Sequence, residues 1–195
     1  MDNTQRQRTA PKDRHAKVSQ DRRQLLTIAC LSAAGAALSP SPAWAQSPPA
    51  SEKTAAPPPP VGSRLPLPDF TLLDGRRLAA SELAGQVVVL YWWASWCPFC
   101  AVQSPLIDQL QRAHRGQGLR VVGLSIDKKP EEASAHLARK GYAYTSAWVS
   151  PELARTLPKP KGLPVTVVLG RDGRVVMSES GQLFPEDIEG IARFL

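Results

Sequence analysis

The stretch that decides the fold is WASWCPFC, from Trp93 to Cys100. Its first residue, Trp93, ends the apolar run VVVLYWW, which predicts a strand covered on both faces of a sheet. Pro98 favours the first position of a helix, where a missing N–H costs nothing, so a helix is expected to begin there with Cys97 as its cap. Cys100 then lies one turn further along, on the same face as Cys97 and close enough for the two sulfurs to bond.

Cys97 has the surroundings of a reactive thiol. A helix N-terminus offers unpaired N–H groups and a partial positive charge, which favour a thiolate over a thiol. The pKa of Cys97 should therefore fall, and the thiolate is the species that attacks a disulfide. We expect Cys97 to be exposed at the end of the turn and Cys100 to be buried beneath the helix.

Residues 1–45 have the pattern of an export signal, in which a basic segment ends at Arg22-Arg23 and the apolar stretch LLTIACLSAAGAAL follows. Ala43-Trp44-Ala45 is the expected cleavage site. The apolar stretch is shorter than the roughly 20 residues that span a bilayer, so we expect cleavage and a periplasmic protein, with an uncleaved membrane anchor as the alternative. DRRQLL also resembles a twin-arginine signal, and the sequence leaves the export route open. Cleavage removes Cys30 and places the chain where disulfides persist.

The net charge of +7 is concentrated in this segment. Seven Lys/Arg and three Asp precede Gln46, which accounts for +4 of the total. The rest of the chain is close to balanced and shows no basic stripe, so no nucleic-acid partner is expected.

The remainder divides into a Pro-rich linker, residues 46–63, and a domain, residues 64–195. The linker is dominated by proline and small polar residues and cannot build a core. In the domain, predicted strands and helices alternate, with a hairpin at Asp74-Gly75, a turn of helix capped by Ser81, and a closing hairpin and helix. This order predicts an α/β fold with a mixed sheet flanked by helices. The helix that begins at Pro98 is expected to pack through Val102, Leu106, Leu110 and Ala113.

Three uses of the cysteine pair compete. A structural zinc site needs four ligands, but His114 and His136 stand alone on separate predicted helices, where we expect them on solvated faces, so no metal is expected. A static disulfide across so short a loop would stabilise little. A redox couple, which needs no cofactor, is favoured.

With these features in hand, the chain resembles thioredoxin-fold proteins, and more narrowly the exported TlpA/ResA-like thiol–disulfide oxidoreductases, over residues 65–195. WCPFC matches the W-C-x-x-C of that family, and CAVQSP matches its C-x-x-E-x-P. GLPVTVVLGRDGRVV resembles the segment that carries a cis-proline, and residues 128–157 resemble the insertion of the subfamily. The expected fold is thioredoxin-like, with an N-terminal β-hairpin and a central helix–strand insertion.

The resemblance implies roles for particular residues. Cys97 is the attacking thiol and Cys100 resolves the mixed disulfide, while Trp96 packs beside the pair. Pro164, if cis, places the backbone of Leu163 where a substrate strand can pair with it.

The chain also departs from the family pattern. Tyr91 stands where many thioredoxins have a buried Asp, Gln103 replaces the Glu of the subfamily, and Val165 replaces a common Thr. Tyr91 and Gln103 are therefore the candidate proton-relay positions for the buried thiol. Pro98 and Phe99 set how well the helix stabilises the thiolate, and with the acids absent they suggest a couple less reducing than thioredoxin.

The function that follows is an extracytoplasmic thiol–disulfide oxidoreductase that reduces disulfides of exported proteins. It would act as a monomer and take electrons from a thiol donor in the membrane, with cytochrome c biogenesis as one setting. A periplasmic dithiol oxidant and a non-catalytic thioredoxin-fold binding or chaperone module are the alternatives. Substrate, donor and direction of electron flow are left open by the sequence.

Overall fold

The computed structural model describes residues 55–195, so the expected export signal and the first half of the linker lie outside the described residues. At the centre is a five-stranded mixed sheet in the order β5-β4-β3-β6-β7. β3 is parallel to β4 and antiparallel to β6, and every residue of β3 and β6 is buried. The strands are β3 (Val87–Trp93), β4 (Leu119–Ser125), β5 (Thr145–Trp148), β6 (Val165–Leu169) and β7 (Val175–Ser180).

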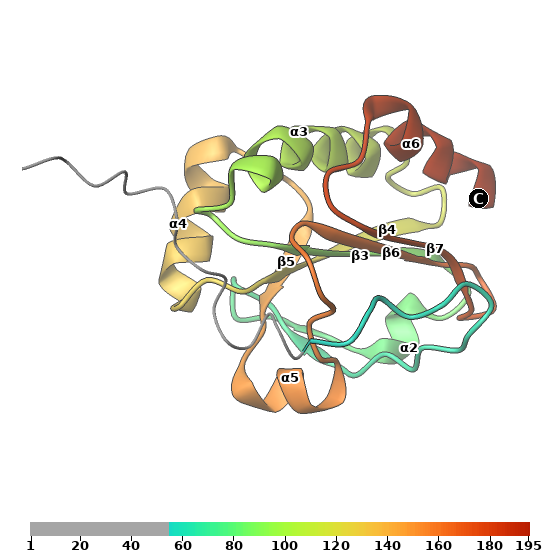
Figure 1. Ribbon diagram of the computed structural model, residues 1–195, viewed down its shortest axis with the longest axis horizontal. Helices are drawn as coiled ribbons and strands as arrows, with labels where there is room; N and C mark the ends of the chain where they lie inside the picture. The colour runs from blue at the N-terminus through green and yellow to red at the C-terminus, as the bar shows by residue number, and fades with distance from the viewer. Residues whose placement is uncertain (1–54) are drawn as a thin grey trace, which may run out of the picture. The chain divides into compact units, whose positions relative to one another are not determined.

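Helices cover both faces of the sheet, which confirms the predicted α/β class (Figure 1). On one side lie α3 (Pro98–Ala113), α4 (Pro130–Lys140) and α6 (Pro185–Glu189), and on the other lie α2 (Ala80–Leu83) and α5 (Pro151–Thr156). Each side has its own apolar core, with Trp93 and Ile107 in one and Trp92 and Phe70 in the other. Adjacent residues of β3 therefore point into opposite cores, as the alternation of a strand requires. No helix within residues 55–195 has the length and apolar character to cross a membrane.

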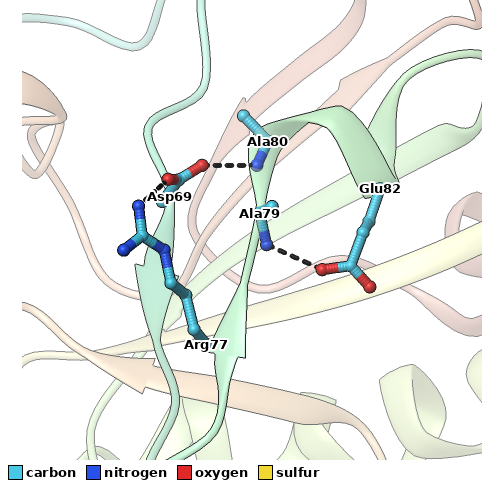
Figure 2. Close-up of polar contacts among 5 residues, drawn as sticks. All are labelled: Asp69, Arg77, Ala79, Ala80 and Glu82. Atoms are coloured by element: carbon cyan, nitrogen blue, oxygen red, sulfur yellow. Dashed lines mark hydrogen bonds and ion pairs between the residues drawn. The ribbon is translucent and has the colours of Figure 1, made fainter.

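The predicted hairpin around Asp74-Gly75 is confirmed as β1 (Phe70–Thr71) and β2 (Arg77–Leu78). Asp69 ties it to α2, because its carboxylate bonds Arg77 and accepts the Ala80 N–H at 2.7 Å (Figure 2). The Glu82 carboxylate accepts the N–H of Ala79 at 2.8 Å. The prediction of Ser81 as the helix cap was wrong, since α2 begins at Ala80 and its acceptor comes from Asp69, a distant part of the chain.

The helix after the cysteines buries only part of the predicted face, since Leu110 is buried and Leu106 half-buried. Val102 is 55% exposed and Ala113 is exposed, whereas the buried side includes four polar residues, Gln103, Ser104, Asp108 and Gln111. These side chains are tolerated there because each has a hydrogen-bond partner. The closing helix α6 ends at Glu189, and a 3₁₀ segment, η1 (Gly190–Phe194), follows it directly.

Candidate active site

The two cysteines lie where β3 passes into α3. Cys97 is the N-cap of α3 and Pro98 its first residue, as predicted. The Cys97 Sγ accepts the Cys100 N–H at 3.2 Å, and both residues are free thiols. The prediction that Cys97 is exposed was wrong: it is 4% exposed and Cys100 1%. The reason is the capping bond itself, which turns the Cys97 sulfur in over the first turn of the helix.

The pair has opposed acidities. Hydrogen bonding to the Cys100 thiol, aided by the N–H groups of Cys100 and Phe99, lowers the pKa of Cys97 to about 7, against the opposing effect of burial. The same hydrogen bond is the largest cause that raises the pKa of Cys100, and burial is the second; together they place it far above its ordinary value. Near neutral pH, Cys97 is thus about half thiolate while Cys100 remains a thiol that donates to it.

Exposed apolar side chains gather around the pair. Trp96 is 61% exposed, and Phe99 and Val102 on the first turns of α3 are 58% and 55% exposed. Phe184, just before α6, is 68% exposed and, with Phe99, lines a groove of about 340 Å³. Leu163, Gly181 and Gln182 complete that groove.

The segment before β6 forms the other wall of the site. The Leu163–Pro164 peptide bond is cis, and the Pro164 carbonyl is held by the Gly181 N–H at 2.8 Å. Within residues 55–195, neither the N–H nor the carbonyl of Leu163 has a hydrogen-bond partner. This leaves one backbone edge open beside the groove.

The two candidate relay positions have different surroundings. Tyr91 is fully buried, and its hydroxyl lies 3.0 Å from Ser104 Oγ and 3.4 Å from the Cys100 carbonyl oxygen. Burial raises the pKa of Tyr91 well above its usual value, so the hydroxyl is protonated. Gln103 is bonded away from the thiols.

Gln103 connects three elements of the fold. Its Nε2 donates to Thr166 Oγ1 on β6 at 2.9 Å, and its Oε1 accepts the Leu183 N–H at 2.8 Å. Both ends of the amide are therefore engaged. It holds α3, β6 and the segment before α6 together next to the groove.

No group of three or more His, Cys, Asp or Glu that could hold a metal occurs within the described part of the chain. His136 is 8% exposed, which contradicts the prediction of a solvated residue. It is buried because α4 packs it against Trp93, with ring centroids 5.6 Å apart.

Sequence reasoning missed one feature of the site. The Asp127 carboxylate, 3% exposed, holds Ser95 in the turn before Cys97. Its position after a buried strand parallel to β3 was the available signal, because such strands end at the same edge of a sheet.

Comparison with known proteins agrees with this geometry. The family model described as Redoxin matches residues 60–192. The chain belongs to the redoxin family. Redoxin relatives include the thiol:disulfide interchange protein DsbE of Allochromatium vinosum, 31% identical over 65% of this chain and 73% of that protein. The thiol-disulfide oxidoreductase ResA of Bacillus thuringiensis is 23% identical over 67% and 75%.

Solved redoxin-like structures lead to the same result. The crystal structure of a putative thiol:disulfide interchange protein DsbE from Chlorobium tepidum is 29% identical, with a TM-score of 0.59 over 69% of this chain and 94% of that one. The resemblance to ResA-like proteins and the thioredoxin-like fold are confirmed, and this redoxin is a thiol–disulfide oxidoreductase.

Proposed function

We propose that this redoxin reduces disulfide bonds of exported proteins outside the cytosol. The observation that carries the proposal is the pair of opposed acidities at Cys97 and Cys100. A Cys97 pKa of about 7 is close to the roughly 7 of thioredoxin, a reductant, and lies far above the roughly 3.5 of the oxidant DsbA. A strongly stabilised thiolate favours the reduced form of the protein, which then readily oxidises other thiols. In this chain the Cys97 thiolate is stabilised only moderately.

The chemistry runs in two steps. The Cys97 thiolate attacks one sulfur of the substrate disulfide, whose S–S bond breaks. The other substrate sulfur leaves as a thiolate and takes a proton. Cys100 then loses its proton and attacks Cys97 Sγ, which releases the second substrate thiolate and leaves a Cys97–Cys100 disulfide. Two electrons have passed to the substrate.

Cys100 has to give up a proton in the second step. We propose Tyr91 as the relay position, because its hydroxyl lies beside Cys100 and contacts Ser104. A hydrogen bond from Tyr91 lowers the pKa of Cys100, although the Cys97 bond and burial outweigh it. Gln103, whose amide is bonded to Thr166 and Leu183, would serve as a brace.

The substrate would bind along the open wall of the site. The unpaired backbone of Leu163 offers a donor and an acceptor to an extended chain, and the exposed rings of Trp96, Phe99 and Phe184 offer apolar contact. Pro164 and Pro98 shape the two sides of this surface. No metal or cofactor takes part in either step.

Location and partners complete the proposal. Residues 1–45 would be the export signal, 46–63 the linker and 64–195 the catalytic domain, active as a monomer in the periplasm. A thiol donor in the membrane would return two electrons to the Cys97–Cys100 disulfide.

The test is a trapping experiment with insulin. Cys100→Ser should retain attack but not resolution, and so accumulate a mixed disulfide that dithiothreitol releases. Cys97→Ser should form no mixed disulfide, and both variants should lose insulin reduction. Full turnover by Cys100→Ser, or no insulin reduction by the unmodified protein, would rule out the mechanism. The second outcome would favour the binding-module alternative.

A further inference from the structure

Asp127 is a buried acid that the two-step chemistry does not use. It follows β4 and is 3% exposed. Burying a carboxylate costs several kcal/mol unless its oxygens are bonded. No lysine or arginine within residues 55–195 bonds Asp127, so its charge is compensated by neutral donors.

Most of these donors come from one residue, Ser95. The Ser95 N–H lies 3.0 and 3.2 Å from the two carboxylate oxygens, and its hydroxyl donates to Oδ1 at 2.6 Å. The Ser125 hydroxyl, at the end of β4, donates to Oδ2 at 2.7 Å. The Asp127 carbonyl is fixed in turn by the Trp148 indole at 2.8 Å. Asp127 thus joins the end of β4 to a single turn through its carboxylate, and the end of β5 through its backbone carbonyl.

That turn carries the attacking thiol. Ser95 lies two residues before Cys97, and the Cys97 N–H bonds the Ala94 carbonyl at 3.2 Å, so Ser95 and Trp96 form the middle of the turn. Trp96 is 61% exposed, so little packing holds the turn from the solvent side. The hydrogen bonds to Asp127 hold it from below.

We propose that Asp127 is the positioning residue of this turn: by anchoring Ser95 it sets where the Cys97 sulfur and the Trp96 ring stand. Asp127 acts through geometry, since the bond between Cys97 Sγ and the first turn of α3 depends on the direction in which the chain enters the helix. His136 on α4 also senses Asp127: its pKa is lowered mainly by burial, then by Arg139 and Lys140, and is raised by the carboxylate.

Asp127→Asn tests the proposal, with Asp108→Asn as the matched control. Asp108 is also buried, with 8% of its surface exposed, but its carboxylate bonds Arg112 and the Ala143 N–H and does not contact the turn before Cys97. The readout is the pH profile of Cys97 alkylation by iodoacetamide, together with kcat/KM for insulin. Loosening the turn should raise the alkylation midpoint by about one pH unit, which from a pKa of about 7 lowers the rate at pH 7 about fivefold. Asp108→Asn should keep the wild-type profile even where it lowers the melting temperature.

A second pair of variants covers the case in which Asp127→Asn does not fold. Ser95→Ala and Ser125→Ala each remove one hydroxyl from the same carboxylate, the first on the turn and the second on the strand. Ser95→Ala should move the alkylation midpoint upward and Ser125→Ala should leave it in place. A folded Asp127→Asn with the wild-type profile, or equal effects of the two serine variants, would overturn the proposal. Neither result touches the trapping experiment, which tests the reaction itself.

Discussion

Removing the Cys100 thiol should make Cys97 a much weaker nucleophile at neutral pH. Hydrogen bonding to Cys100 is the largest cause that lowers the pKa of Cys97 from 9.0 to about 7. In Cys100→Ala that donor is lost, while burial, which raises the pKa, remains. The N–H groups of residue 100 and of Phe99 stay in place and retain part of the effect. The pKa should then lie between about 8 and 9, near that of a free cysteine.

The magnitude follows from the thiolate fraction. With a pKa of about 7, half of Cys97 is ionised at pH 7, and with a pKa of about 8 roughly one part in eleven is ionised. The alkylation rate at pH 7 should therefore fall at least about fivefold in Cys100→Ala. Cys100→Ser keeps a hydroxyl donor at the same place and should show a smaller loss.

The assay is the pseudo-first-order rate of iodoacetamide alkylation from pH 5 to pH 10, followed by intact mass. At pH 10 all three proteins should react at nearly the same rate, which shows that access to the sulfur is unchanged. A midpoint that stays at about 7 in Cys100→Ala would refute the reasoning, because the helix N-terminus alone would then account for the acidity of Cys97.

Three further predictions concern the surroundings of the pair. Gln103→Leu leaves the Leu183 N–H unpaired and should lower the free energy of unfolding in urea by about 2 to 4 kcal/mol. The control Gln109→Leu, at an exposed position of the same helix, should change it by less than about 0.5 kcal/mol. Equal effects of the two variants would contradict the bracing role of Gln103. For the reduced protein, the lowered pKa of Cys97 predicts that stability rises by about 1 kcal/mol between pH 6 and pH 8, where the unfolded thiol still holds its proton. Above about pH 8.5 the raised pKa of Cys100 acts in the opposite direction, because only the unfolded Cys100 ionises there. The rise below pH 8 should vanish in Cys97→Ser, and a flat wild-type profile would exclude it. Phe184→Ala should lower kcat/KM for insulin about two- to fivefold, the equivalent of up to about 1 kcal/mol of apolar contact. The rate with glutathione disulfide, a small substrate, should not change. An equal loss with both substrates would show a general defect and not a lost contact with insulin.

The parts of the fold that the sequence predicts are those with a strong local pattern. The run before Trp93 has only apolar and aromatic residues and forms the fully buried β3. Pro98 after Cys97 places the helix start at the correct residue, and Ser150, a residue type that favours helix caps, caps α5 by accepting the Leu153 N–H. In each case the deciding interaction lies within a few residues of the signal.

The predictions that were wrong concern features that depend on contacts between distant segments of the chain. Ser81 is a good cap by type, but Asp69 supplies the acceptor from outside the helix. Val102 fits an apolar stripe, yet α3 buries Gln103 because Thr166 and Leu183 complete its hydrogen bonds. Local periodicity contains no information about such partners.

The candidate site divides in the same way. Spacing and helix position identified both cysteines, and family resemblance identified Pro164, whose peptide bond is cis. Asp127 was missed, because its bonds to Ser95 form only once β3 and β4 lie side by side. The burial of Cys97 likewise arises from the direction of one capping bond.

The measurement that tests the central claim most directly is the equilibrium reduction potential of the Cys97–Cys100 couple, titrated against glutathione and dithiothreitol redox buffers. We expect a value between those of thioredoxin and the glutaredoxins, about −270 to −200 mV, as suits a reductant supplied by a membrane donor. A potential close to that of DsbA, about −120 mV, would contradict the proposed reductase function, because the protein would then pass its disulfide to substrates rather than reduce them.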